Sequence, residues 1–191
     1  MPTKIGIIGG SGFYKLFGLE KEKKVNVNTP FGDVNVITGI FAGREVAFIP
    51  RHGEKHTVPP HMINYRANVY ALFSLGVEKV IATSAVGSLK NDYKPGDILI
   101  PDQIIDFTKS RTYTFFDGKF SVELHDGNIR GGVYHADVTN PYCEELRRLI
   151  YEAAKDMNLK VHFGGTYVCT EGPRSVSYTH LRAHETEADL V

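Results

Sequence analysis

The sequence predicts an α/β fold, a single layered domain with a mixed central sheet flanked by helices, because apolar strand patterns alternate with two helical patterns. Several strand patterns are too apolar to alternate with polar residues, which indicates strands buried on both faces. Helical periodicity runs from Ile63 to Ala71 and from Leu146 to Met157. The strand patterns are Lys4–Gly9, Val34–Thr38, Val46–Ile49, Lys79–Thr83, Asp97–Ile100 and Val161–Cys169.

Two further features complete the expected organisation. Asn140 and Pro141 precede the second helical pattern, and they predict its start because Asn caps a first turn and Pro suits the first helical position. The segment from Asp106 to Arg130 is rich in Phe, Tyr, Gly, Lys and Asp and has no persistent period. We interpret this segment as a long functional loop or flap.

Composition excludes several classes of protein. The 191 residues suffice for one ordinary domain, and 22 basic against 22 acidic side chains leave no net charge to hold nucleic acid or a membrane surface. No apolar run approaches the roughly 20 residues that span a bilayer, and no signal peptide precedes the first strand, so we expect a cytoplasmic protein. Cys143 and Cys169 are expected to be reduced core thiols.

A glycine-rich turn follows the first strand, at Gly9-Gly10-Ser11-Gly12. Glycines let backbone N–H groups approach an anion closely, and the Ser11 hydroxyl adds a donor. The dinucleotide pattern G-x-G-x-x-G fails because Lys15 stands where the last glycine belongs, and the sequence has no G-x-x-x-x-G-K-[ST] run. The turn therefore indicates a phosphate site, although a turn without a ligand stays open.

Two other loops carry suitable partners. Arg51 and His52 follow an apolar strand, where a guanidinium suits bidentate contacts with phosphate and His adds a hydrogen bond. Thr83 and Ser84 follow another strand, at the kind of strand end where α/β sheets bind ligands. The alternatives are a solvated basic corner and local side-chain to backbone bonding. We expect the three loops to converge on one small ligand.

The histidines do not predict a metal site. His56 and His61 flank two prolines, and we interpret both as structural or surface residues. His180 and His184 lie four apart beside Glu185, but the H-E-x-x-H pattern is missing and no third ligand can be named.

From Lys4 to Arg174 the chain resembles the trimeric nucleoside phosphorylases, most closely the 5'-methylthioadenosine phosphorylases. Many matches in one order make chance similarity remote. The motifs are Gly6-Ile7-Ile8-Gly9-Gly10-Ser11-Gly12, Pro50-Arg51-His52-Gly53 with His56, Asn64-Tyr65-Arg66-Ala67-Asn68, Ser84-Ala85-Val86-Gly87-Ser88-Leu89, Pro95-Gly96-Asp97 with Pro101-Asp102-Gln103, Phe115-Phe116-Asp117-Gly118 and Glu171-Gly172-Pro173-Arg174.

The resemblance implies an activity and its residues. Family members cleave the N-glycosidic bond with inorganic phosphate as co-substrate, and they need no metal or organic cofactor. It implies that His135 lies near the 5'-alkylthio group, reached from a neighbouring subunit of a homotrimer or hexamer. It also implies that phosphate is bound by Ser11, Arg51, His52 and Ser84, with the Ala85 backbone beside them.

The chain departs from the family pattern after Arg174. Residues 175–191 lack the expected Met-Thr segment and the Asp-bearing strand for the purine, so we assign no catalytic residue. We expect residues 1–174 to be a partial phosphorylase domain, incomplete at its C-terminus, and residues 175–191 to be a non-native tail, such as translated adapter sequence.

The expected function is phosphorolysis of 5'-methylthioadenosine to adenine and 5-methylthioribose 1-phosphate. A phosphorylase for 5'-methylthioinosine or 6-oxopurine nucleosides is the alternative, because the residues that discriminate the bases lie in the missing segment. An inactive fragment or a phosphate- and nucleoside-binding protein is the alternative of another class.

Overall fold

The computed structural model describes residues 4–172, and these residues form two compact units. Residues 4–86 and 112–134 make the first unit, and residues 87–111 and 135–172 make the second. The predicted α/β class with a mixed sheet is confirmed. The boundary expected after Arg174, the tail at 175–191, and His180 and His184 all lie outside the described residues, so the expected domain organisation stays a prediction.

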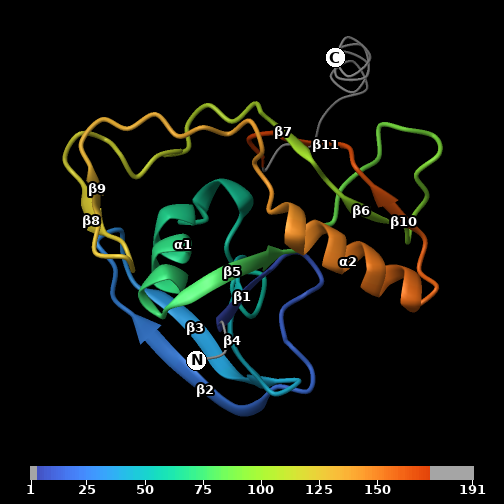
Figure 1. Ribbon diagram of the computed structural model, residues 1–191, viewed down its shortest axis with the longest axis horizontal. Coiled ribbons are helices and arrows are strands. Elements are labelled where there is room, and N and C mark those ends of the chain that lie inside the picture. The colour runs from blue at the N-terminus through green and yellow to red at the C-terminus, as the bar shows by residue number, and fades with distance from the viewer. Residues whose placement is uncertain (1–3, 173–191) are drawn as a thin grey trace. The chain divides into compact units, whose positions relative to one another are not determined.

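A mixed five-stranded sheet forms the centre of the first unit, in the order β2-β3-β4-β1-β5 (Figure 1). Strand β1 lies between β4 and β5 and is parallel to both, whereas β2 and β3 join the sheet in antiparallel fashion. The strands are β1 Lys4–Gly9, β2 Glu20–Val27, β3 Val34–Phe41, β4 Arg44–Pro50 and β5 Val77–Ala82.

Helix α1 (Tyr65–Ser74) covers one face of this sheet and follows a short 3-10 helix, η1 (Pro60–Met62). The Asn64 side chain caps α1 by accepting a hydrogen bond from the Ala67 N–H at 3.1 Å, because that N–H has no partner within the helix. The Asn64 amide also donates to the Phe31 carbonyl at 2.6 Å. The helix and sheet bury a common apolar cluster, which comprises Val34, Val36, Ala47, Ile49, Ala67, Ala71, Leu72 and Val77.

The segment after β1 covers the opposite face. Phe48 is fully buried there, and the edge of the Phe13 ring meets it with the centroids 5.6 Å apart. Alternate residues of β4 point to opposite faces, so Phe48 serves this cluster while Ile49 serves the one beneath α1. The sheet is therefore buried on both faces, as the apolar strand patterns indicate. The buried members of this second cluster are Leu16, Ile37, Val46 and Phe48.

Strand β2 has no counterpart among the predicted strands. Its sequence, EKEKKVNV, is largely exposed at the edge of the sheet, and Lys24 pairs with Glu54 at 2.7 Å. An edge strand rich in lysine resists pairing with other molecules, and its charges hide it from a search for apolar patterns.

The segment Asp106 to Arg130 is not one continuous loop, which corrects the prediction. It contains β8 (Ser121–Glu123) and all but the last residue of β9 (Ile129–Gly131), and the two strands form a hairpin. Strands of three residues are too short to show a period. The hairpin turn places Gly127 at φ +81°. The nearby His125 ring stacks on Phe73 of α1 with the centroids 4.4 Å apart.

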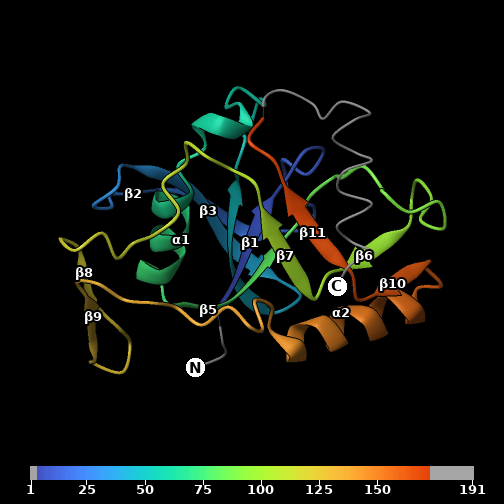
Figure 2. The same ribbon diagram turned by 90° about the horizontal axis from the view of Figure 1, so that it is seen from above.

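The second unit contains two short parallel ladders (Figure 2). Strand β6 (Ile98–Ile100) pairs with β10 (Val161–Phe163), and β7 (Gln103–Asp106) pairs with β11 (Thr166–Cys169). The predicted continuous strand from Val161 to Cys169 is therefore wrong. Gly164 and Gly165 interrupt it with φ of +104° and +138°, a conformation that glycine adopts without strain.

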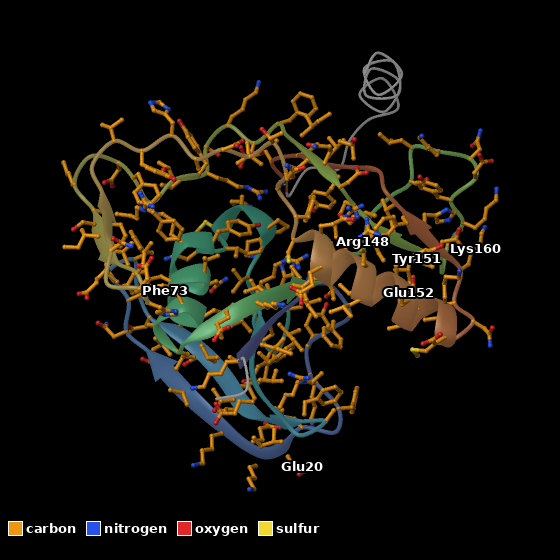
Figure 3. All side chains as sticks on the ribbon, in the orientation of Figure 1. Glu20, Phe73, Arg148, Tyr151, Glu152 and Lys160 are labelled. Carbon is orange, nitrogen blue, oxygen red and sulfur yellow. The ribbon has the colours of Figure 1, made fainter. Side chains whose placement is uncertain are left out.

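Helix α2 spans Glu144–Asp156 and begins three residues after Pro141, so the prediction of Asn140 as the cap and Pro141 as the first helical residue is wrong. Cys143 holds the cap position in extended conformation, and its carbonyl accepts from the Arg147 N–H at 3.0 Å. The carboxylates of Glu144 and Glu145 lie in the first turn, where they interact favourably with the positive end of the helix dipole. Tyr151, labelled in Figure 3, packs its ring on that of Phe163 of β10, with the ring centroids 5.1 Å apart.

The two cysteines differ in burial. Both are free, but Cys143 is exposed and is not the core thiol that we predicted. Burial raises the pKa of the half-buried Cys169 thiol, which keeps it protonated at neutral pH.

An ion cluster ties β10 to the turn before β6. Asp97 accepts from His162 Nε2 at 2.7 Å and from Lys160 Nζ at 3.0 Å. The His162 bond, with the backbone N–H of Lys94, holds the pKa of Asp97 well below its usual range.

Within residues 4–172, no helix combines the length and apolarity needed to cross a membrane.

Replacing Phe48 tests the core of the first unit. We expect Phe48→Ala to lower the free energy of unfolding by about 3–5 kcal/mol, because it leaves a cavity between the sheet and residues 13–19. Phe17→Ala is the matched control, since that side chain is 79% exposed and should change the free energy little. Urea unfolding measures both, and equal effects of the two changes would contradict this packing.

Candidate functional site

Three parallel strands of the first unit end side by side. In register, Gly9 of β1 pairs with Pro50 of β4, and Ile8 pairs with Ala82 of β5. The ladder continues one residue further, because the Arg51 N–H donates to the Gly9 carbonyl at 3.1 Å. The glycine-rich turn, Arg51 and the Thr83 loop therefore leave the sheet at one edge.

Hydrogen bonds link these three strand ends. Nη1 of Arg51 donates to the Thr83 carbonyl at 2.5 Å, and Nη2 donates to Ser84 Oγ at 3.0 Å. The Gly10 N–H donates to Thr83 Oγ1 at 3.1 Å. We call Gly10, Arg51, Thr83 and Ser84 the strand-end cluster. The structure thus brings together the three loops that the sequence analysis expected to converge.

Glycine is required at position 10. A Cβ on this residue would lie 2.3 Å from the Thr83 carbonyl oxygen and 2.6 Å from Nη1 of Arg51. Both distances are shorter than any van der Waals contact, so the missing side chain is what lets the turn approach the guanidinium. The sequence predicted that this glycine lets an anion approach closely, whereas the groups that lie close to it are Arg51 and Thr83.

Ser11 and Ala85 lie in the exposed parts of the same loops. Ser11 stands in the turn that the Phe13 N–H closes by donating to the Gly10 carbonyl at 3.0 Å. Ala85 comes two residues after Thr83 and is exposed. Their contacts with phosphate stay predictions.

His52 is buried in the loop after β4, with 5% of its surface exposed. Its Nδ1 lies 2.9 Å from the Val58 carbonyl oxygen, which can only accept a hydrogen bond. The proton must therefore sit on Nδ1, and Nε2 remains as the nitrogen for a ligand. Contact of Nε2 with phosphate stays a prediction.

Thr83 is the residue whose role the sequence analysis missed. It entered only as one hydroxyl among several, but its carbonyl holds Arg51 and its hydroxyl holds the Gly10 turn. The available signal was a residue with a hydroxyl directly after a parallel strand. This signal does not predict which neighbouring residue the side chain contacts.

Arg66 of α1 serves the packing of the first unit. Its guanidinium lies 4.5 Å from the centre of the Phe31 ring and 3.8 Å from the Asp117 carboxylate. Hydrogen bonds from the backbone N–H groups of Lys119 and Phe120 lower the pKa of Asp117, and Arg66 adds to this effect. Asn64 caps α1, so both side chains make structural contacts within the first unit.

His135 and Glu171 belong to the second unit. His135 is exposed, and its contact with a 5'-alkylthio group stays a prediction. The Glu171 carboxylate accepts from the Lys109 and Ser110 N–H groups and from Arg111 Nε at 3.2 Å. These bonds, the backbone ones first, lower the pKa of Glu171 to about 2, so the carboxylate is ionised at neutral pH.

Comparison with known proteins decides the family. The sequence model of a family described as the phosphorylase superfamily matches residues 4–191. The chain belongs to this superfamily. Among its phosphorylase relatives, a 6-oxopurine nucleoside phosphorylase of Pyrococcus furiosus is 51% identical over 184 residues, and an S-methyl-5'-thioadenosine phosphorylase of the same organism is 51% identical over 193 residues. The alignments cover 96% and 100% of this chain, and 67% and 69% of the relatives.

Solved phosphorylase structures agree with this assignment. A methylthioadenosine phosphorylase from Schistosoma mansoni in complex with adenine superimposes with a TM-score of 0.87 at 33% identity, covering 97% of this chain and 68% of that one. The protein is accordingly a purine nucleoside phosphorylase by family, and the names of its relatives divide between methylthioadenosine and 6-oxopurine nucleosides.

A methyl group at position 10 tests the strand-end cluster. We expect Gly10→Ala to lower the free energy of unfolding by about 1–3 kcal/mol, because the loops must separate to accept the Cβ. It should also abolish the rise in melting temperature that we expect added phosphate to give the parent protein. Gly87→Ala is the control, since nothing lies within 4 Å of its added Cβ. Thermal unfolding with and without phosphate measures both, and an unchanged Gly10→Ala protein would contradict the close approach.

Removing the Arg51 charge tests anion binding. We expect Arg51→Met to raise the Kd for inorganic phosphate about tenfold to a hundredfold, as the loss of hydrogen bonds to a charged ligand does. Arg44→Met removes the same charge from the other end of β4, where Arg44 is exposed, and should leave the Kd within about twofold. Titration calorimetry distinguishes the two, and equal Kd values would exclude Arg51 as a phosphate ligand.

Proposed function

We propose that the protein catalyses phosphorolysis of 5'-methylthioadenosine, giving adenine and 5-methylthioribose 1-phosphate. The observation that carries this proposal is the strand-end cluster, in which one guanidinium, a hydroxyl and a glycine-rich turn meet at the carboxyl ends of three parallel strands. Open α/β sheets bind ligands at this edge. The family assignment supplies the reaction class.

The chemistry needs an anion held against the sugar. A phosphate oxygen forms a bond to C1' while the bond from C1' to the purine nitrogen breaks, and the bonding electron pair leaves with the base. Positive charge develops at C1' in the transition state, so a fixed phosphate stabilises it. In the proposed complex Arg51, Ser84 and Ser11 donate to phosphate oxygens and His52 contacts the phosphate through Nε2. These residues orient the nucleophile without bonding to the sugar.

The departing base also needs a proton, because it otherwise leaves as an anion. We assign this step to no residue of the sequence. The Ala85 backbone completes the proposed contacts with phosphate. The family resemblance implies that His135 of a neighbouring subunit lies at the 5'-alkylthio group.

A second substrate has support of equal weight in the comparisons. A probable 6-oxopurine nucleoside phosphorylase of Dictyoglomus turgidum is 49% identical to this chain, and a 6-oxopurine nucleoside phosphorylase of Pyrococcus furiosus is 51% identical. We favour 5'-methylthioadenosine because the sequence motifs resemble those of the 5'-methylthioadenosine phosphorylases most closely. The two substrates differ at position 6 of the purine, where an amino group donates hydrogen bonds and an oxo group accepts them.

The deciding assay measures base release by the protein expressed from its complete gene. With 5'-methylthioadenosine we expect adenine only when phosphate is present, and at a higher kcat/KM than hypoxanthine from inosine. The reverse order would establish the 6-oxopurine alternative. Binding of phosphate and nucleoside without release of either base would leave a binding protein and overturn the enzyme proposal.

A further inference from the structure

A second connection joins the loop after β1 to the loop after β4, and it passes through Tyr14 and His56. The Tyr14 hydroxyl lies 2.8 Å from Nδ1 of His56, with the two rings edge to face. The His56 ring in turn packs against His52, with centroids 4.7 Å apart and planes 34° apart. A chain of three side chains therefore runs from the glycine-rich loop to the buried histidine.

The backbone of this turn is held in an unusual conformation. His56 has φ +54°, in the left-handed region that residues with a Cβ adopt only at a cost. Its N–H donates to the Gly53 carbonyl at 3.1 Å, and the His52 carbonyl accepts from the Val58 N–H at 2.9 Å. These bonds keep the turn closed, and the closed turn is what places the His56 ring on His52.

Burial differs sharply along the chain of side chains. The bond between Tyr14 and His56 is exposed, and an exposed hydrogen bond adds little to the stability of a fold. His52 at the other end is buried and tied through Nδ1 to Val58. The main effect of the exposed bond is therefore to fix the position of the His56 ring against His52.

We propose that Tyr14 and His56 are positioning residues that aim Nε2 of His52 at phosphate, an inference that rests on the function proposed above. The Val58 carbonyl fixes one nitrogen but leaves the imidazole free to tilt about that contact. The His56 ring blocks the tilt from one side, and the Tyr14 hydroxyl keeps the His56 ring in place. Neither residue touches the reacting atoms.

Binding of inorganic phosphate to variants of the protein tests this inference. Tyr14→Phe should raise the Kd about threefold to tenfold, the effect of losing one hydrogen bond that orders a ligand-binding group. Its melting temperature without phosphate should stay close to that of the parent. Tyr65→Phe is the matched control, because it removes a hydroxyl that donates to the Pro60 carbonyl at 3.2 Å in the same unit. That variant should keep the parent Kd.

Two further measurements separate positioning from a general structural role. His56→Phe should raise the Kd as Tyr14→Phe does, and the double variant should be no worse than either single one, because both changes cut the same chain. In NMR spectra of the ring nitrogens, the phosphate-induced shift of His52 Nε2 should shrink in Tyr14→Phe.

Arg51→Met serves as the reference in the same titration. If Arg51→Met weakens phosphate binding while Tyr14→Phe leaves the Kd and the Nε2 shift unchanged, the positioning role is overturned and the proposed function stands. If Arg51→Met also leaves the Kd unchanged, the proposed phosphate site itself fails.

Discussion

The parallel register of β1 with β4 and β5 is the constraint on which the site depends. Because Gly9 aligns with Pro50 and Ile8 aligns with Ala82, the residues that follow each strand emerge together. Slipping β4 by one residue would exchange the side chains that it gives to the two clusters, so Phe48 and Ile49 would change faces and lose their packing. Burial of the sheet on both faces therefore fixes the positions of Gly10, Arg51 and Thr83 as firmly as it fixes the core.

The sequence predicted the buried strands and both helical patterns, because long apolar runs and a 3.6-residue period can be recognised without knowledge of the tertiary contacts. Strand β2 and the β8–β9 hairpin escaped, since charged edge strands and three-residue strands carry no apolar pattern. The start of α2 was misplaced because Asn140 and Pro141 suit a helix start by type alone, whereas the acidic pair Glu144 and Glu145 marks the real first turn.

The candidate site was predictable in its loops and not in its contacts. A glycine-rich turn, an arginine and two hydroxyls at strand ends predict an anion site, because their groups donate hydrogen bonds to anions. Which atoms meet depends on the twist and register of the sheet, so neither the hold of Thr83 on Arg51 nor the link from Tyr14 to His56 follows from spacing. The family resemblance named the roles of residues, and the structure supplies the physical links between them.

The bond from Arg51 to the Thr83 carbonyl has a consequence for evolution of this edge of the sheet. A long, mobile side chain normally loses much of its rotamer freedom when a ligand arrives, and that loss weakens association. Here most of that freedom is surrendered when the chain folds. Lysine at position 51 would keep the charge but lose the two-pronged contact with Thr83 and Ser84. Replacement of this arginine by lysine is therefore not a conservative substitution.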